Sequence, residues 1–179
     1  MSPKAKKAVL GIAGWSGAGK TALITALIPA LRQRGVSVST IKHAHHKFDV
    51  DKPGKDSYQH RQAGASQVLV SSANRWALMT ELRDEPEARL EDLLAQLAPV
   101  DLVLVEGFKS EDWVPKIEVF RMANGKDPLW PQRAEIIAVA KPAADALEDA
   151  APPALDLDQP EQIADFIQEW LARQQQEQG

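Results

Sequence analysis

One segment near the start of the chain limits the fold more than any other feature. Its residues are Gly14, Trp15, Ser16, Gly17, Ala18, Gly19, Lys20 and Thr21. They match the pattern G-x-x-x-x-G-K-[ST] in full. A short apolar run, residues 8–13, precedes the segment, and apolar residues at helical spacing follow it up to Arg34. A strand, a glycine-rich turn and a helix in this order predict a phosphate-binding loop, so we expect the chain to bind a nucleoside triphosphate.

Each residue type in this loop has a physical task. Gly14, Gly17 and Gly19 allow the backbone to curl so that successive N–H groups point at the phosphates. The Lys20 ammonium is expected to reach the β- and γ-phosphates, and the Thr21 hydroxyl is expected to coordinate Mg²⁺. We therefore expect all of residues 14–21 to contact the nucleotide, with Lys20 also assisting catalysis.

A second candidate site residue follows the most apolar segment of the chain. Residues 100–105 contain four consecutive apolar residues and are followed by Glu106 and Gly107. A carboxylate is costly inside a strand unless it lies at the strand end, in a site. We expect Glu106 to hold Mg²⁺ or to position the attacking water. The backbone N–H of Gly107 is expected to contact the γ-phosphate.

Residues 42–56 form a polar loop with several potential ligands. These are His43, His45, His46, Asp49, Asp51 and Asp56. The loop fits three interpretations: a switch or substrate-contact loop, a solvated surface loop, or a transition-metal site. If it is a switch loop, Asp49 is the candidate for a second Mg²⁺ contact, through water. Asp56 also suits the cap of a following helix.

The remaining pattern predicts one α/β domain over residues 1–179, with the three-layer fold and mostly parallel sheet of a P-loop NTPase. Residues 66–81 are expected to form an antiparallel β-hairpin extension, which would make the sheet mixed. Residues 149–160 carry three prolines and are expected to form an extended connector. A helix is expected over 160–173, and a frayed tail over 174–179.

Composition narrows the possible partners and the compartment. The net charge of −4 argues against a nucleic-acid partner, because such proteins usually present a basic face. No stretch approaches the roughly 20 apolar residues that span a bilayer, so no membrane partner is expected. The chain has no cysteine, which fits a reducing compartment. We expect a protein of the cytoplasm.

Three segments together give the chain a family resemblance. The phosphate loop, the run Lys42-His-Ala-His-His-Lys-Phe-Asp-Val-Asp-Lys-Pro-Gly-Lys-Asp-Ser57 and the run Leu104-Val-Glu-Gly-Phe-Lys109 resemble those of molybdopterin-guanine dinucleotide biosynthesis protein B, the MobB family. The second run is the more specific, and the resemblance covers residues 8–140. It implies a GTP-binding, weakly hydrolysing adapter protein of molybdenum cofactor biosynthesis. It also implies Mg²⁺, a homodimer, and molybdopterin and a molybdopterin guanylyltransferase as partners.

Two other functions share the phosphate loop. A small-molecule kinase would require a lid rich in arginine, and the arginines of this chain are scattered. A nickel-inserting GTPase usually offers cysteine ligands, and this chain has none. The residues alone leave the base open, because the usual Asn/Thr-Lys-x-Asp signature of guanine sites is absent.

Overall fold

The computed structural model describes residues 7–44, 48–148 and 150–176, and it divides into two compact units. The first unit contains the chain up to His43 and from Leu93 onward, and the second contains Ala44–Asp92. The expectation of a single nucleotide-binding domain over residues 1–179 stays a prediction. The phosphate loop belongs to the first unit.

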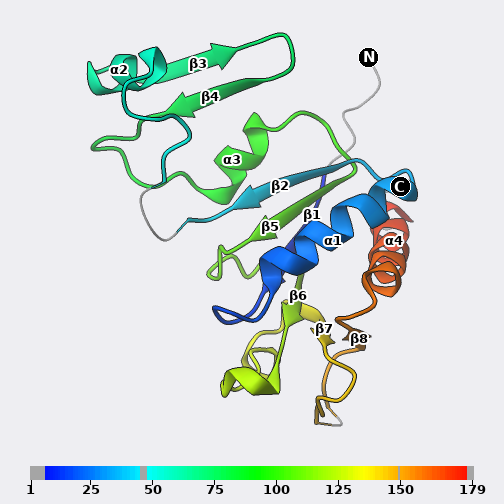
Figure 1. Ribbon diagram of the computed structural model, residues 1–179. Coiled ribbons are helices and arrows are strands. Elements are labelled where there is room, and N and C mark those ends of the chain that lie inside the picture. Colours follow the sequence, from blue (N-terminus) through cyan, green and yellow to red (C-terminus); the bar gives the residue numbers. More distant parts are fainter. Residues whose placement is uncertain (1–6, 45–47, 149, 177–179) are drawn as a thin grey trace. The chain divides into compact units, whose positions relative to one another are not determined.

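The first unit is built on a six-stranded sheet (Figure 1). Its strands are β1 (Ala8–Ala13), β2 (Val38–Lys42), β5 (Leu102–Glu106), β6 (Lys116–Val119), β7 (Ile136–Lys141) and β8 (Ala154–Asp156). Their order is β2-β5-β1-β6-β7-β8, and every pairing is parallel. The prediction of a mixed sheet was wrong, because the antiparallel pair forms a separate sheet. The carboxyl ends of β1, β2, β5 and β6 meet at one edge, where open α/β sheets place their ligands.

Strand β8 lies in the segment that we predicted to be a connector. It is only three residues long and follows Pro152 and Pro153, so the sequence offers no strand periodicity. Two backbone hydrogen bonds fix it to β7: Val139 donates to the Pro153 carbonyl, and Leu157 donates to the Lys141 carbonyl. The strand therefore forms because the open edge of β7 pairs with it, and not because of a local strand propensity.

Helices α1 (Lys20–Gln33) and α4 (Pro160–Gln176) form one layer against the sheet. They contact each other, and they share a buried core with the strands. Its largest fully buried members include Leu10, Ile12, Leu27, Leu104 and Ile167. Helix α1 contains Pro29 and continues beyond it to Gln33. The core thus holds the amino end of α1 firmly behind the phosphate loop.

A second, smaller hydrophobic cluster packs against β6 and β7. Phe120, Ile136 and Val139 are buried there, with Leu129 and Trp130 packed against them. The covering segment, residues 121–133, contains two short 3-10 helices, η1 (Met122–Asn124) and η2 (Trp130–Gln132). The fully buried Glu118 carboxylate accepts hydrogen bonds from the backbone N–H groups of Leu129 and Trp130, at 2.8 and 3.0 Å. Residues 121–133 are therefore tied to the strand end beside the phosphate loop.

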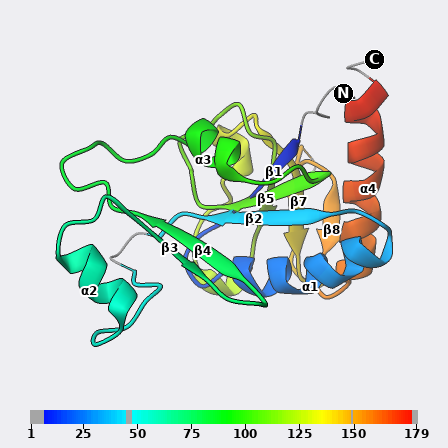
Figure 2. The same cartoon turned by 90° about the horizontal axis from the view of Figure 1, so that it is seen from above.

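The second unit consists of α2 (Asp56–Gln62) and an antiparallel hairpin, β3 (Gln67–Ser71) and β4 (Trp76–Thr80). Figure 2 shows the two strands as a ribbon of their own. The antiparallel hairpin is confirmed. The helix-cap interpretation of Asp56 was wrong: the cap is Lys55, in an extended conformation, and it makes no side-chain capping bond. Helix α3 (Leu90–Gln96) spans the boundary between the units.

Within the described ranges, no helix combines the length and apolar character needed to cross a membrane.

Candidate functional site

The phosphate loop leaves β1 and enters α1 with three glycines at positive φ. The values are 135° for Gly14, 80° for Gly17 and 105° for Gly19. A Cβ on Gly14 would lie 2.5 Å from the backbone oxygen of Val119, so no other residue fits there. The sequence expectation of a curled loop between strand and helix is therefore confirmed in its backbone.

Lys20 is folded back over this loop. Its Nζ donates to the carbonyl oxygens of Gly14 and Trp15, both at 2.9 Å. Partial burial lowers the pKa of the ammonium; Glu106 opposes this shift, whereas Lys109 and Lys42 add to it. A phosphate oxygen is a charged acceptor and would bind the ammonium more strongly than the two neutral carbonyls.

Thr21 and Glu106 meet beneath the loop. The Thr21 hydroxyl donates to Glu106 Oε1 at 3.0 Å, with Oε2 at 3.2 Å. Glu106 is the last residue of β5, and the parallel register pairs it with Ile12 of β1. This pairing places Glu106 close to the loop that leaves β1. The side chain of Glu106 is only 13% exposed. The structure thus joins two residues that the sequence assigned to one Mg²⁺ site.

Lys42 is a third member of this cluster and was missed by the sequence analysis. It pairs directly with Glu106 across β2 and β5. Its Nζ lies 3.5 Å from Glu106 Oε1 and 3.4 Å from the Thr21 hydroxyl oxygen. The sequence placed Lys42 at the start of the polar loop of residues 42–56, whereas the structure makes it the last residue of β2. Carboxyl ends of parallel strands converge, which brings it into the site.

The segment after Glu106 has an unusual backbone. Gly107 has φ 98°, and Phe108 has φ 50°, which is rare for a residue with a side chain. A Cβ on Gly107 would lie 2.6 Å from His43 Cβ. The His43 and Phe108 rings pack with centroids 5.0 Å apart. Such backbone strain concentrates at functional sites. Contact between the Gly107 N–H and a phosphate stays a prediction.

Trp15 connects the phosphate loop to two neighbouring segments. Its Nε1 donates to the Asp127 carbonyl at 2.8 Å. The Nζ atoms of Lys109 and Lys126 lie 5.5 and 5.9 Å from its ring centroid, within cation–π range. Arg121, the second residue after β6, donates from Nε to the Ala18 carbonyl at 3.1 Å.

The loop is therefore surrounded by positive charge. The cationic residues that contact it or its neighbours are Lys20, Lys42, Lys109, Arg121 and Lys126. Sequence analysis had identified only Lys20, since the others come from three separate places: the end of β2, the segment after β5 and the segment between β6 and β7. In a chain with net charge −4, this concentration favours a polyanionic ligand such as a triphosphate.

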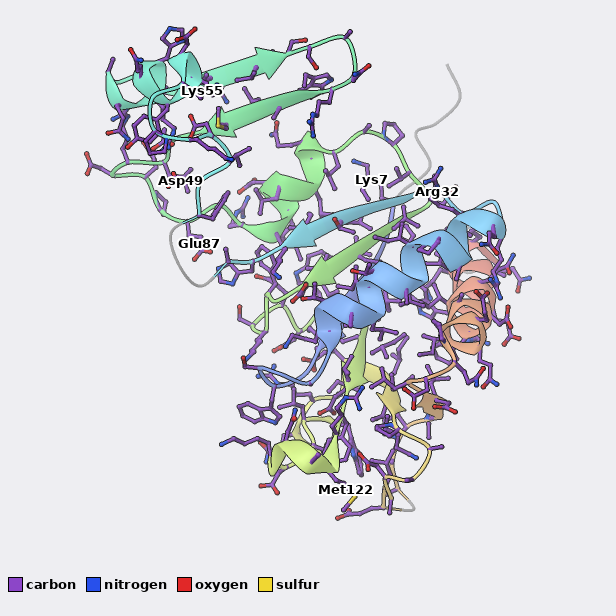
Figure 3. All side chains as sticks on the ribbon, in the orientation of Figure 1. Lys7, Arg32, Asp49, Lys55, Glu87 and Met122 are labelled. Atoms are coloured by element: carbon purple, nitrogen blue, oxygen red, sulfur yellow. The ribbon has the colours of Figure 1, made fainter. Side chains whose placement is uncertain are left out.

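Asp49 belongs to the second unit, whereas Thr21 and Glu106 belong to the first. Arg61 Nη2 holds both Asp49 and Asp51 at 2.8 Å, and Arg61 Nη1 lies 3.3 Å from Glu81. The hydrogen bond to Asp51 is the main cause that raises the pKa of Arg61. Figure 3 labels Asp49 in the segment ahead of α2. A Mg²⁺ contact through Asp49 stays a prediction.

The transition-metal interpretation of the polar loop receives no support from the described residues. Among them, no three His, Cys, Asp or Glu side chains are grouped as metal ligands. His45 and His46 lie outside the described residues.

Known proteins resemble this chain along nearly its whole length. Residues 9–142 match the family model of molybdopterin guanine dinucleotide synthesis protein B, MobB. The molybdopterin-guanine dinucleotide biosynthesis adapter protein of Escherichia coli (strain K12) is 47% identical over 178 residues, which is 97% of this chain and 99% of that protein. The Haemophilus influenzae protein of the same name is 45% identical, covering 91% and 89%. A crystal structure of molybdopterin-guanine biosynthesis protein B superposes with a TM-score of 0.71 at 30% identity, covering 92% of this chain and 99% of that one.

Proposed function

This chain belongs to the MobB family of molybdopterin guanine dinucleotide synthesis proteins, and from that premise we propose that it is a GTP-binding adapter of this pathway. It binds GTP with Mg²⁺ in the loop of residues 14–21 and hydrolyses it slowly. The partner enzyme is the guanylyltransferase that joins GMP to molybdopterin. The protein acts in the cytoplasm as a homodimer.

The contact between Thr21 and Glu106 carries this proposal. Hydroxyl and carboxylate oxygens suit Mg²⁺, and these two lie 3.0 Å apart at the start of α1. Thr21 and Glu106 are the residues that would hold the ion. A bound Mg²⁺ would supply positive charge there, which would offset the negative charge of the phosphates.

The surrounding lysines support a triphosphate over a smaller anion. Lys20 starts α1 inside the loop, and Lys42 approaches from β2 on the side of Glu106. Each added phosphate group brings charge that these ammonium groups favour. The nucleotidyl transfer itself belongs to the partner, because nothing in the described loops of this chain resembles a guanylyltransferase active site.

Calorimetric titration of the full chain with GTP, ATP and GDP, each with Mg²⁺, tests the proposal. We expect GTP to bind most tightly and the affinity to fall when Mg²⁺ is omitted. Preference for ATP would contradict the adapter assignment and favour a small-molecule kinase. A second titration, with the guanylyltransferase added to the GTP-loaded chain, tests the partner.

A further inference from the structure

The ammonium group of Lys42 contacts the same two side chains that we assign to Mg²⁺. Its Nζ lies 3.5 Å from Glu106 Oε1 and donates to the Thr21 hydroxyl oxygen at 3.4 Å. The Thr21 hydroxyl in turn donates to Glu106 Oε1 at 3.0 Å. The three groups form a closed set of contacts, in which one cation of the chain lies against both of the oxygens that suit a metal ion.

The backbone holds Lys42 opposite Glu106. The two residues are partners in the parallel pairing of β2 with β5, and the backbone N–H of His43 donates to the Glu106 carbonyl at 2.8 Å. The Glu106 side chain is only 13% exposed, whereas that of Lys42 is 59% exposed. The ammonium can therefore turn toward another acceptor, and the carboxylate cannot follow it. An ion pair with so exposed a partner is weak, so the exchange of partners costs little.

One carboxylate cannot serve both Lys42 and Mg²⁺ without repulsion between the two cations. Mg²⁺ binds its oxygen ligands closely, and like charges at such separations repel strongly. Burial is the main cause that lowers the pKa of Lys20, and the charges of Lys109 and Lys42 lower it further. The ammonium groups around Glu106 therefore repel one another in the structure, and a divalent ion would add to this repulsion.

We propose that Lys42 makes metal binding at Thr21 and Glu106 conditional on a γ-phosphate. Without that phosphate, the ammonium stays on Glu106 and competes with the metal. A γ-phosphate offers the ammonium a strongly charged acceptor, which frees the carboxylate for Mg²⁺. Lys42 is then the residue through which the metal site distinguishes a triphosphate from a diphosphate. The inference rests on the proposed function, because it needs a nucleotide bound at residues 14–21.

Manganese binding to the full chain without nucleotide tests the competition. Mn²⁺ accepts the same oxygen ligands as Mg²⁺, and electron paramagnetic resonance measures its free concentration. We expect Lys42→Met to bind Mn²⁺ at least about tenfold more tightly than the natural chain, because a repelling charge is removed. Lys42→Arg keeps the charge and should bind Mn²⁺ as weakly as the natural chain. Equal Mn²⁺ affinity of Lys42→Met and the natural chain would overturn the proposal.

A second variant locates the metal that Lys42→Met gains. The double variant Lys42→Met/Glu106→Gln lacks the carboxylate for which the two cations compete, so the gain in Mn²⁺ affinity should disappear. If the double variant binds Mn²⁺ as tightly as Lys42→Met, the ion lies elsewhere and the competition for Glu106 is refuted.

Nucleotide titrations test the link to the γ-phosphate. The affinities for GTP and GDP are measured by calorimetry with Mg²⁺ and with an excess of EDTA. In the natural chain, Mg²⁺ should strengthen GTP binding much more than GDP binding. In Lys42→Met this difference should shrink several-fold, because coupling between two ligands is lost when the residue that connects them is removed. An undiminished difference in Lys42→Met would contradict the proposal.

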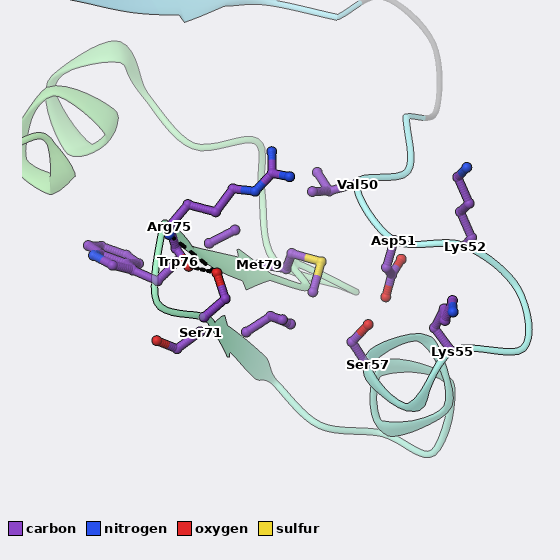
Figure 4. Close-up of a pocket in the computed structure, with 12 residues that line it drawn as sticks. Val50, Asp51, Lys52, Lys55, Ser57, Ser71, Arg75, Trp76 and Met79 are labelled. Carbon is purple, nitrogen blue, oxygen red and sulfur yellow. Dashed lines mark hydrogen bonds between the residues drawn. The ribbon is translucent and has the colours of Figure 1, made fainter.

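The second unit provides lysines for a matched control. They line a cavity of about 660 Å³, whose lining residues fall within residues 50–79. Lys52, Lys55 and Arg75 give this cavity a positive charge, because its acidic residue, Asp51, is held by Arg61 at 2.8 Å. Figure 4 shows Lys52 and Lys55 on the segment that leads into α2. The cavity thus offers lysines that lie in the same polar loop as Lys42 but in the other unit.

Lys55→Met removes the same charge as Lys42→Met and keeps the side-chain stem. Lys55 belongs to the second unit, whereas Thr21 and Glu106 belong to the first. We therefore expect Lys55→Met to bind Mn²⁺, GTP and GDP as the natural chain does. If Lys55→Met gains as much Mn²⁺ affinity as Lys42→Met, net charge controls the metal and the position of Lys42 does not, which would refute the proposal.

The two kinds of measurement separate this inference from the proposed function. GDP binding at the natural affinity shows that Lys42→Met folds. If the natural chain binds GTP with Mg²⁺ and Lys42→Met matches it in every titration, only the role of Lys42 is wrong. If the natural chain binds no GTP, the proposed function is wrong, whatever the Mn²⁺ titration gives.

Discussion

The hydroxyl of Thr21 and the carboxylate of Glu106 are joined by a 3.0 Å hydrogen bond, although the two residues are 85 positions apart in the sequence. Thr21 is the second residue of α1, and Glu106 ends β5. This pair defines where the phosphate loop meets the sheet edge, and the predictions about nucleotide chemistry depend on it.

Glu106→Gln should reduce GTP hydrolysis more than GTP binding. The amide keeps the size of the side chain and one oxygen, but it loses the charge that favours Mg²⁺ and orients water. We expect the turnover rate to fall at least about tenfold, with the dissociation constant for Mg²⁺-GTP changed by less than about threefold. Phosphate release and calorimetry measure the two quantities. An equal loss in both would mean that Glu106 acts mainly on the loop structure.

Lys20→Ala should weaken GTP and GDP together, by more than about tenfold, because it removes a charge-assisted contact to the phosphates. Calorimetric titration measures both affinities. Arg32→Ala removes a charge at the other end of the same helix and serves as the control. Unchanged GTP affinity in Lys20→Ala would refute the phosphate-loop assignment.

Lys42→Met should reduce the preference for GTP over GDP. The Lys42 ammonium lies 3.5 Å from Glu106, on the Mg²⁺ side of the loop, where a γ-phosphate adds charge that GDP lacks. Methionine keeps most of the unbranched stem and removes the charge. We expect the GTP affinity to fall several-fold and the GDP affinity to stay nearly constant. If the affinities for GTP and GDP fall by the same factor, Lys42 acts, like Lys20, as a contact to the phosphates that both nucleotides share.

Lys116→Met should destabilise the fold. Lys116 and Glu135 are 3.3 Å apart, with side chains only 3% and 7% exposed. Removing one partner leaves a buried charge poorly compensated, which costs about 3–5 kcal/mol. Urea unfolding of the single variant measures the loss. Here Arg133, at 3.3 Å from Glu135, should keep the loss near the lower end of that range.

The double variant Lys116→Met/Glu135→Leu is the matched comparison for this pair. Removing both charges should restore much of the lost stability, because the uncompensated carboxylate is gone. If the double variant is no more stable than the single one, the loss comes instead from the hydrogen bonds of Lys116 to the carbonyls of Glu111 and Val114.

Asp101→Asn should make the protein less sensitive to acid. Hydrogen bonds from the Ser37 hydroxyl and from the Ser37 backbone N–H lower the pKa of Asp101. Because the pKa of Asp101 is lower in the folded state, its ionised carboxylate stabilises the fold above the unfolded-state pKa of about 3.9. This stability is lost as the pH falls through the folded-state pKa. The natural chain should therefore be more stable than Asp101→Asn at pH 7, with the difference shrinking below about pH 4.

Denaturant unfolding at several pH values measures this difference. Ser37→Ala removes only the hydroxyl contribution and should show a smaller effect in the same direction. A difference that is constant between pH 7 and pH 3 would mean that the ionisation of Asp101 does not contribute.

The structure also shows why some sequence predictions succeeded. The phosphate loop is a local feature, in which spacing, glycines and flanking apolar runs occur within 27 consecutive residues, 8–34. Glu106 was found because an acid directly after a run of four apolar residues has few favourable places except a strand end. The hairpin followed from two short strands around a tight turn.

Other features were decided by long-range register. The local sequence places Lys42 in a polar segment after an apolar one, and only the parallel pairing of β2 with β5 brings it opposite Glu106. The same holds for Arg121, which reaches Ala18 across 103 residues. Strand β8 exists because β7 offers it an open edge, and the hairpin forms its own sheet rather than making the main sheet mixed.

The sequence by itself determined the phosphate loop, the strand that ends in Glu106 and the class of the fold, because short-range spacing and apolar pattern encode them. Only the tertiary structure decided which cations gather around the phosphate loop, the buried Lys116–Glu135 pair and the charged cavity of residues 50–79. Each of these depends on which strand ends and loops become neighbours. Which segments become neighbours depends on the burial of the core and on backbone pairing over the whole chain, and no short segment determines it.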